Sequence, residues 1–498
     1  MAKRLPILYS ALLLTSVNLL LRFVSTSFQV HITTKIGPEG VGLLQLVMSV
    51  GSLALTAGMA GIRTTTMYLT AEELGKKRPE NIKWVMRGCY LYSILCSGVI
   101  SIGMYLFAPW IATHWIGNPG VTWAVRIFSI NLPLVCICGC LTGYFTAANR
   151  IGALAIVEIG EQFCYMVFTL LALNFWADTA EQACACVVLG TGVSASFTIL
   201  CLAILRYREK LAKGPKQPIR RRLLSCALPL AAADNIKAGI STLENLLVPK
   251  RLAMYAGEIS PLAAFGRVCG MVFPVLMFPA AILFALAELL IPELARCAVS
   301  ENKARINHLA KKSLRIAMLY GFLCGGILFL VAKPLCQSIY GDETAGTYLR
   351  WYALLAPMLY CDAITDAMSK RLGKQHINVR YNIITSAMDV ALLFMILPKM
   401  GMTGYFISFL VTHAINFLLS LNLLSKTVGF SIPFYYPVYA GFATVAAVIA
   451  AQVARGWPAQ VIGFLGLCGG LYSLLGLVSG KDIRWIISLV HKKKSPVA

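Results

Sequence analysis

Residues 5–30, LPILYSALLLTSVNLLLRFVSTSFQV, contain a single charged side chain, Arg22. A helix of about 20 apolar residues crosses a bilayer core about 30 Å thick, so this stretch is long enough to span a membrane. Lys3 and Arg4 precede it, as cations precede a signal peptide, but the stretch is longer than the apolar core of a signal peptide and lacks a small-x-small cleavage site. We therefore expect an uncleaved first span that carries an arginine.

Similar apolar runs recur along all 498 residues. The chain is 58% hydrophobic and 13% charged, whereas a soluble domain has about 25% charged residues. This composition predicts an all-α polytopic membrane protein. We expect about fourteen transmembrane helices, at 6–30, 41–68, 84–108, 121–146, 151–176, 182–205, 223–249, 261–291, 313–334, 346–369, 377–398, 403–424, 434–453 and 458–479.

The net charge of +23 is distributed unevenly among the connections between these spans. Alternate connections, together with both ends of the chain, hold 31 of the 44 Lys and Arg residues. The positive-inside rule places that side in the cytoplasm, with both termini there. Topology and anionic lipid explain this charge better than nucleic-acid binding. The predicted outer side holds seven cations: Lys35, Lys250, Arg251, Lys333, Arg350, Lys399 and Arg455.

The longest basic connection divides the chain into six spans before it and eight after it. The turn at 37–40, Gly-Pro-Glu-Gly, faintly resembles the turn at 257–260, Gly-Glu-Ile-Ser, which favours a six-helix repeat. The last two spans are rich in Gly and Ala and predict a groove for a lipid tail. The expected organisation is an N-terminal lobe at 1–205, a basic cytoplasmic linker at 206–222, a C-terminal lobe at 223–426, the lipid-tail helix pair at 427–480 and a basic cytoplasmic tail at 481–498.

Arg22, Arg63 and Arg267 lie inside predicted spans and lack an acidic residue within four positions, whereas Arg87 and Arg126 lie near span ends, where their side chains can reach the interface. A charge at bilayer depth normally faces a wet cavity or a partner. Guanidinium groups that face one cavity suit a phosphate headgroup, which they bind through two parallel hydrogen bonds. Lys237 is a further candidate for such a site, although Asp234, three residues earlier, offers it an ion pair. The alternative for the arginines is pairing across helices with buried acids: Glu158, Glu161, Glu244, Asp366 or Asp389.

Two groups of acids also lie inside predicted spans. Glu158 and Glu161 are one helical turn apart, and Asp362, Asp366 and Lys370 form a stripe at intervals of four. Such groups bind a coupling cation or relay protons in transporters. An interhelical ion-pair lock at the cytoplasmic gate is an equally good interpretation, and the residues leave both open.

Signals of catalysis or of a metal site are absent from the sequence. It contains no HExxH, P-loop or GxSxG motif, and the cysteines occur mostly inside apolar runs without a ligand-type cluster. The predicted outer connections are mostly short. Transport is therefore favoured over catalysis, with no catalytic residue and no cofactor expected.

Several motifs resemble the stage V sporulation protein B group of the multidrug/oligosaccharidyl-lipid/polysaccharide (MOP) exporter superfamily. They are LLLRF around Arg22, IGPEGVGLLQL at 36–46, AGIR at 60–63 and AEELGKK at 71–77. The superfamily also contains the lipid II and O-antigen flippases. The resemblance implies two six-helix lobes related by a pseudo-twofold axis around a central cavity, and alternating access. It implies a role in cortex formation in sporulating bacteria, and it makes Arg22, Arg63 and Arg267 the residues that engage a pyrophosphate.

Two functions follow from the residues and this resemblance. The first is a monomeric flippase of the bacterial plasma membrane that moves a polyprenyl-pyrophosphate-linked sugar. Its expected partners are this lipid-linked substrate and the membrane lipids around the protein. The second is a cation-coupled multidrug exporter of the same fold. The drive would come from the membrane potential or from a Na⁺ or H⁺ gradient.

Overall fold

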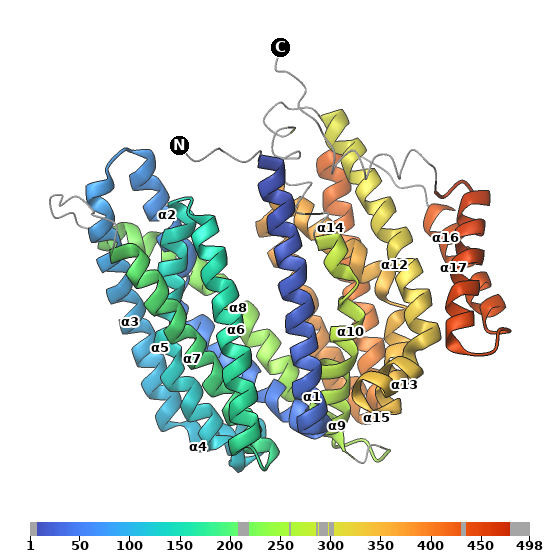
Figure 1. Ribbon diagram of the computed structural model, residues 1–498, viewed down its shortest axis with the longest axis horizontal. Helices are drawn as coiled ribbons and strands as arrows, with labels where there is room; N and C mark the ends of the chain where they lie inside the picture. Colours follow the sequence, from blue (N-terminus) through green and yellow to red (C-terminus); the bar gives the residue numbers. More distant parts are fainter. Residues whose placement is uncertain are drawn as a thin grey trace. The chain divides into compact units, whose positions relative to one another are not determined.

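The computed structural model describes residues 7–207, 219–257, 260–284, 287, 297, 303–429 and 435–478, and the side chains from residue 20 onward. Within these residues the chain is helical and contains no strand (Figure 1). The elements are α1 (Ile7–Met59), α2 (Ile62–Gly75), η1 (Pro79–Asn81), α3 (Ile82–Leu106), α4 (Ala108–Trp110), η2 (Ile111–Ile116), η3 (Pro119–Val121), α5 (Thr122–Ala147), α6 (Ile151–Trp176), α7 (Ala180–Tyr207), α8 (Arg220–Leu252), α9 (Pro261–Gly266), η4 (Arg267–Val272), α10 (Phe273–Met277), α12 (Lys303–Tyr340), α13 (Glu343–Ala353), α14 (Ala356–Arg371), α15 (Gln375–Val428), α16 (Tyr435–Ala451) and α17 (Trp457–Leu474).

Eight helical stretches in the described residues are long and apolar enough to cross a membrane, and shorter apolar helices accompany them. The predicted polytopic helical class is therefore confirmed. The predicted spans at 84–108, 121–146, 151–176, 182–205 and 223–249 correspond to α3, α5, α6, α7 and α8. The total of fourteen spans stays a prediction.

Two of the long helices are each interrupted at one glycine, where the sequence predicts a turn between two spans. Gly37 in α1 has φ 75° and ψ 172°, and Gly401 in α15 has φ 57° and ψ −139°. Backbone angles of this kind are open to glycine and strained for other residues. Each helix therefore consists of two segments.

The chain also breaks at two places inside spans that the sequence predicts as continuous. The span predicted at 41–68 is interrupted at Ala60 and Gly61, with φ 41° and 71°, and α2 begins directly afterwards. An added Cβ at Gly61 would lie 3.0 Å from the carbonyl oxygen of Ala227, so α8 passes close to this break. The span predicted at 346–369 is divided between α13 and α14, and Pro357 stands at the start of α14.

The contacts group the chain into two compact units. Unit 1 contains the described residues of Met1–Thr34, Arg267–Leu392 and Lys399–Ala498, and unit 2 contains those of Lys35–Gly266 and Leu393–Pro398. The grouping differs from the predicted lobes, because the first segment of α1 belongs to unit 1 and α8 belongs to unit 2. The lobes at 1–205 and 223–426, with their pseudo-twofold relationship, stay a prediction.

The two turns that resemble each other in sequence meet within unit 2. The hydroxyl of Ser260 donates a hydrogen bond to the carboxylate of Glu39. Gly42 lies so close to α9 that an added Cβ would be 2.3 Å from the carbonyl oxygen of Leu262. Most of the predicted linker at 206–222, the end of the span at 261–291 and the tail at 481–498 lie outside the described residues.

Candidate functional site

Arg22 lies in the first segment of α1, in unit 1, and its side chain is half-buried. Its Cζ atom lies 4.8 Å from the centroid of the Phe284 ring, a cation–π contact within unit 1. No carboxylate in the described part of the chain forms an ion pair with it. Neither acid of unit 1 that the alternative prediction offers, Asp366 or Asp389, is its partner. The guanidinium of Arg22 is therefore available for an anion.

Arg63 lies in unit 2, in the first turn of α2 directly after the break at Ala60 and Gly61, and is exposed. Two glycines of α5 allow α2 to approach closely there. An added Cβ at Gly143 would lie 2.5 Å from the carbonyl oxygen of Arg63, and one at Gly139 would lie 3.8 Å from its Cβ. The Gly139–Gly143 spacing thus packs the backbone of Arg63 against α5 in the way small residues pack membrane helices.

The acids Glu158 and Glu161 on α6 lie within electrostatic range of the Arg63 guanidinium, and all three belong to unit 2. No ion pair within 4.0 Å joins Arg63 to either carboxylate in the described structure. Lys237 and Asp234 are both exposed on α8, and the predicted pair between them is likewise not formed among the described side chains. Unit 2 therefore presents two cations, Arg63 and Lys237, and three acids, Glu158, Glu161 and Asp234, among which no ion pair is formed in the described structure.

Arg267 begins the π-helical turn η4, a local geometry that often marks functional sites. Its Nε atom lies 2.7 Å from Oδ2 of Asp342, with side chains 24% and 12% exposed. Asp342 also caps α13, because its Oδ1 accepts a hydrogen bond from the backbone N–H of Ala345 at 2.9 Å. The predicted alternative of a cross-helix partner thus applies to Arg267, but with an acid that the sequence did not single out. The two terminal nitrogens of Arg267 form no hydrogen bond in the described part of the structure.

The predicted stripe on α14 lies in unit 1 and forms polar contacts to α15. Asp366 pairs with Lys370 at 2.6 Å and accepts a hydrogen bond from Asn378 at 3.3 Å. Asp362 accepts one from Asn416 at 3.4 Å, while its second carboxylate oxygen is buried without a partner. The stripe therefore consists of one paired acid and one incompletely satisfied acid.

Asp389 is a buried acid that the sequence offers only as a pairing partner for arginines, whereas in the structure its partners are hydroxyl groups. It lies on the first segment of α15 and is 4% exposed. From the second segment, Ser408 and Thr412 donate hydrogen bonds to its Oδ1 at 2.6 and 3.0 Å. The available signal was the spacing of Ser408 and Thr412 by four residues, which places both hydroxyls on one helix face.

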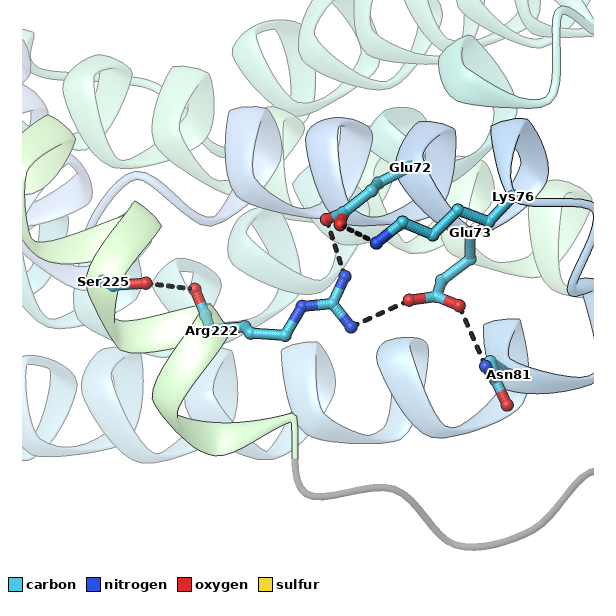
Figure 2. Close-up of polar contacts among 6 residues, drawn as sticks. All are labelled: Glu72, Glu73, Lys76, Asn81, Arg222 and Ser225. Atoms are coloured by element: carbon cyan, nitrogen blue, oxygen red, sulfur yellow. Dashed lines mark hydrogen bonds and ion pairs between the residues drawn. The ribbon is translucent and has the colours of Figure 1, made fainter.

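A cluster of polar side chains in unit 2 joins the end of α2, η1 and the start of α8, beyond the predicted span at 41–68 (Figure 2). Arg222 donates hydrogen bonds to Glu72 at 2.6 Å and to Glu73 at 2.8 Å. Glu72 also pairs with Lys76, and Glu73 accepts a hydrogen bond from Asn81 at 2.9 Å. Both acids come from the AEELGKK motif, and Arg222 is the last residue of the predicted basic linker.

This cluster shifts the pKa of each of its acids. The pKa of Glu72 is lowered by hydrogen bonds from Lys76 and Arg222. Burial of Glu73 acts to raise its pKa, but hydrogen bonds from Asn81 and Arg222 outweigh the burial and lower it. Hydrogen bonds to the same two acids raise the pKa of Arg222. All three groups are therefore held in their charged forms.

The described residues contain no group of three or more His, Cys, Asp or Glu side chains that is arranged to hold a metal ion. The side-chain contacts given above suit the recognition of charged groups. Cations available to an anion occur in both units, and buried carboxylates with hydroxyl or amide partners occur in unit 1.

Comparison with known proteins shows which proteins this chain resembles. Residues 7–243 match the family described as "Polysaccharide biosynthesis protein". Stage V sporulation protein B of Bacillus subtilis (strain 168) is 22% identical over 449 residues, which cover 87% of this chain and 86% of that protein. Sporulation protein YkvU of the same organism is 21% identical over 327 residues, covering 64% of this chain and 71% of that protein.

Two solved structures share the fold. The lipid II flippase MurJ, in an inward closed conformation, has a TM-score of 0.68 against this chain. The two chains are 11% identical, and the match covers 95% of this chain and 100% of that chain. An inward-facing MATE family multidrug transporter has a TM-score of 0.64 with 14% identity, covering 83% and 96%. The two solved proteins are a flippase and a multidrug transporter, and at these identities the likeness shows the fold. The chain is a multi-pass membrane protein that is similar to stage V sporulation protein B and shares its fold with a lipid II flippase and with a multidrug transporter of the MOP superfamily.

Proposed function

We propose that the protein is a flippase that moves a polyprenyl-pyrophosphate-linked sugar across the bacterial plasma membrane by alternating access. The observation that carries the proposal is Arg22, a half-buried guanidinium within an apolar helix that pairs with no carboxylate among the described residues. A cation at this depth is costly unless it meets an anion. A pyrophosphate supplies that anion, and a guanidinium binds its oxygens through two parallel hydrogen bonds.

Arg63, Lys237 and Arg267 extend the proposed pyrophosphate-binding set. Arg63 and Lys237 are exposed and carry charges that no ion pair within the described residues neutralises. Arg267 keeps its terminal nitrogens for an anion while its Nε atom is held by Asp342. In this proposal the sugar-linked pyrophosphate meets these cations during the transport cycle, and the polyprenyl tail stays in lipid.

A cation-coupled multidrug exporter is the second candidate. The likeness to MATE family transporters, the buried acid Asp389 and the half-buried acid Asp362 favour it, because carboxylates at membrane depth attract a cationic drug or a coupling ion. The two candidates differ in the charge of the cargo. A flippase requires the arginines, whereas a cationic-drug exporter requires the acids.

Transport in proteoliposomes separates the candidates. The purified protein is reconstituted, and the outward movement of a fluorescent undecaprenyl-pyrophosphoryl sugar is compared with that of ethidium. We expect the lipid-linked sugar to move faster than in protein-free vesicles and ethidium to show no such increase. Ethidium transport that requires Asp362 or Asp389, without movement of the lipid-linked sugar, would establish the exporter instead.

The proposed orientation places both termini in the cytoplasm, because the basic connections alternate along the chain. Reporter fusions at Gly214 and after Ala498 are then expected to report the cytoplasm. Fusions at Asn118 and Asp342 are expected to report the outer side. An outer signal from Gly214 would contradict this orientation.

A further inference from the structure

An apolar groove of about 730 Å³ lies in unit 1 between α16 on one side and α12, α13 and the start of α14 on the other. Its size falls within the range of pockets that hold small molecules, about 300–1,000 Å³. Its walls are formed by Phe322 and Phe329 of α12, Trp351 and Leu354 of the α13 end, and Val445 and Ile449 of α16. Trp351, Leu354, Val445 and Ile449 are all more than half exposed, so the groove is open at the surface of unit 1.

The packing of α12 explains why the groove exists. Gly325 and Gly346 allow α12 and α13 to approach closely, since an added Cβ would lie 2.7 Å from backbone atoms of the facing helix at each position. On the α17 side, Gly326 accommodates the ring of Phe464. The helix α16 packs on α12 and α17, and it contributes the opposite wall of the groove rather than closing it. The predicted groove in 427–480 thus involves α16, whereas Gly466, Gly469 and Gly470 of α17 are not among its walls.

One end of the groove is cationic. Lys333 and Arg350 line it, and they also line a smaller polar cavity of about 290 Å³ together with Gln452 and Gln460. Lys333 lies seven residues before the end of α12 and Arg350 seven residues after the start of α13. At 1.5 Å per residue, both lie about 10 Å from the helix ends. By the positive-inside rule these are the outer ends of the helices.

The two cations differ in their partners. Lys333 pairs with Glu343 at 2.9 Å, with side chains 49% and 65% exposed. Arg350 pairs with no carboxylate in the described residues, and its Cζ atom lies 4.4 Å from the centroid of the Phe329 ring, at the groove wall. Lys333, Arg350 and Glu343 together carry a net charge of +1. The groove therefore joins an apolar surface for an acyl chain to a single uncompensated positive charge.

We propose that this groove binds an anionic glycerophospholipid of the outer leaflet, with an acyl chain along α16 and its phosphodiester on Arg350. The charge matches: one phosphodiester carries one negative charge, as the net charge at the groove end requires. A pyrophosphate-linked lipid would bring more negative charge than this end can neutralise. The amides of Gln452 and Gln460 are suited to hydrogen-bond a glycerol headgroup. None of the residues that line this groove belongs to the proposed pyrophosphate-binding set.

Trp351 provides a direct readout. The protein is placed in phosphatidylcholine nanodiscs that contain increasing amounts of phosphatidylglycerol brominated on its acyl chains, which quenches nearby tryptophan fluorescence. The signal of Trp351 is taken as the difference between the wild type and the Trp351→Phe variant. We expect its quenching to saturate at a low fraction of phosphatidylglycerol and to be weak with brominated phosphatidylcholine.

Charge variants test the headgroup contact. Arg350→Gln is expected to weaken the phosphatidylglycerol dependence by at least about tenfold, the effect of losing one charge-assisted hydrogen bond. Lys333→Gln is expected to weaken the preference as well, because Glu343 then leaves no net positive charge at this end of the groove. Lys399→Gln is the matched control, because Lys399 is an exposed cation of unit 1 that does not line the groove.

Three results would overturn the proposal. They are equal quenching by the two brominated lipids, unchanged phosphatidylglycerol dependence in both Arg350→Gln and Lys333→Gln, and displacement of phosphatidylglycerol by a small fraction of undecaprenyl phosphate. The last result would assign the groove to the tail of a polyprenyl cargo. None of these results bears on the transport of a lipid-linked sugar, which the proteoliposome assay measures separately.

Discussion

Arg222, at the start of α8, lies 2.8 Å from the carboxylate of Glu73, which stands near the end of α2 and is only 2% exposed. The same guanidinium contacts Glu72 through its other terminal nitrogen (Figure 2). A buried carboxylate needs this compensation, because an uncompensated buried charge is strongly destabilising. The contact ties the end of the basic linker to the helix that carries Arg63.

Replacement of Arg222 by glutamine is expected to destabilise the purified protein. Glu73 would keep its hydrogen bond from Asn81 but lose its cationic partner. The loss of a hydrogen bond to a charged group lowers the free energy of unfolding by about 1.5–3 kcal/mol. We expect the lower end of this range, because the Arg222 side chain is 36% exposed. The melting temperature in detergent measures the effect. Arg221→Gln is the control, since Arg221 is exposed and neighbours Arg222; an equal decrease in both variants would contradict a specific contact.

The same cluster predicts a pH dependence. The pKa values of Glu72 and Glu73 are lowered in the folded protein, so their contribution to stability is present above the ordinary glutamate pKa and is lost as the pH falls through the lowered values. The difference in melting temperature between the wild type and Arg222→Gln is therefore expected to be constant from pH 7 to pH 5 and to shrink below about pH 4.5. A difference that persists undiminished at strongly acidic pH would contradict this linkage.

The local turns of this fold could be predicted from the sequence, whereas its long-range contacts could not. Gly37 and Gly401 interrupt apolar runs of membrane length, so each marks a boundary by local chemistry alone. The positive φ of Ala60 is different, because alanine does not favour such a backbone angle and the sequence therefore does not predict it. It occurs where α8 passes Gly61. Such a break depends on the packing of segments far apart in the sequence.

The candidate site shows the same division. An arginine in an apolar run is conspicuous in the sequence, which is why the sequence predicts Arg22, Arg63 and Arg267 as site residues, a prediction that stays open. The partner of Arg267 was not, because Asp342 is 75 residues away and looks like an ordinary loop acid and helix cap. Asp389 was undervalued for a related reason, since its partners Ser408 and Thr412 lie across the Gly401 turn and the register of the two segments decides their contact.

Loss of Arg22 or Arg63 is expected to impair transport without affecting expression. Arg22→Ala and Arg63→Ala should each reduce complementation of a flippase-deficient strain, because a charge-assisted contact to phosphate is worth about 1.5–3 kcal/mol, or at least tenfold in affinity. Lysine variants should recover only part of the activity, since the two parallel hydrogen bonds are lost. Arg87→Ala is the control, an exposed arginine near a predicted span end. Full activity of both alanine variants would remove the anionic-cargo mechanism.

The Arg267–Asp342 pair separates a structural role from a binding role. Asp342→Asn keeps an oxygen to cap α13 but removes the charge that holds Arg267. If Arg267 engages the cargo, Arg267→Ala should lose far more transport than Asp342→Asn, while the two variants have similar melting temperatures. Equal losses of transport in both variants would instead show that Arg267 acts only through this ion pair.

The membrane potential is the expected drive for transport. Moving one net charge across the membrane is worth about 2.3 kcal/mol per 100 mV, which is comparable to the free-energy gap between two conformations of a transporter. Collapsing the potential in proteoliposomes while the Na⁺ and H⁺ gradients are maintained should therefore stall movement of the lipid-linked sugar.

Variants of the acids then identify any coupling ion. Dependence on Na⁺ or H⁺ alone, with the potential irrelevant, would require a carboxylate that binds the ion in one conformation. The candidates are Glu158 and Glu161 in unit 2 and Asp362 and Asp366 in unit 1, with Asp389 added by the structure. Asp362 and Asp389 are the stronger candidates among them, because Asp366 is already paired with Lys370 at 2.6 Å. Asp362→Asn and Asp389→Asn should abolish an ion-driven component, whereas Asp366→Asn should reduce it less. A potential-driven transporter would retain its activity in the Asp366→Asn variant and lose it only when the potential is collapsed.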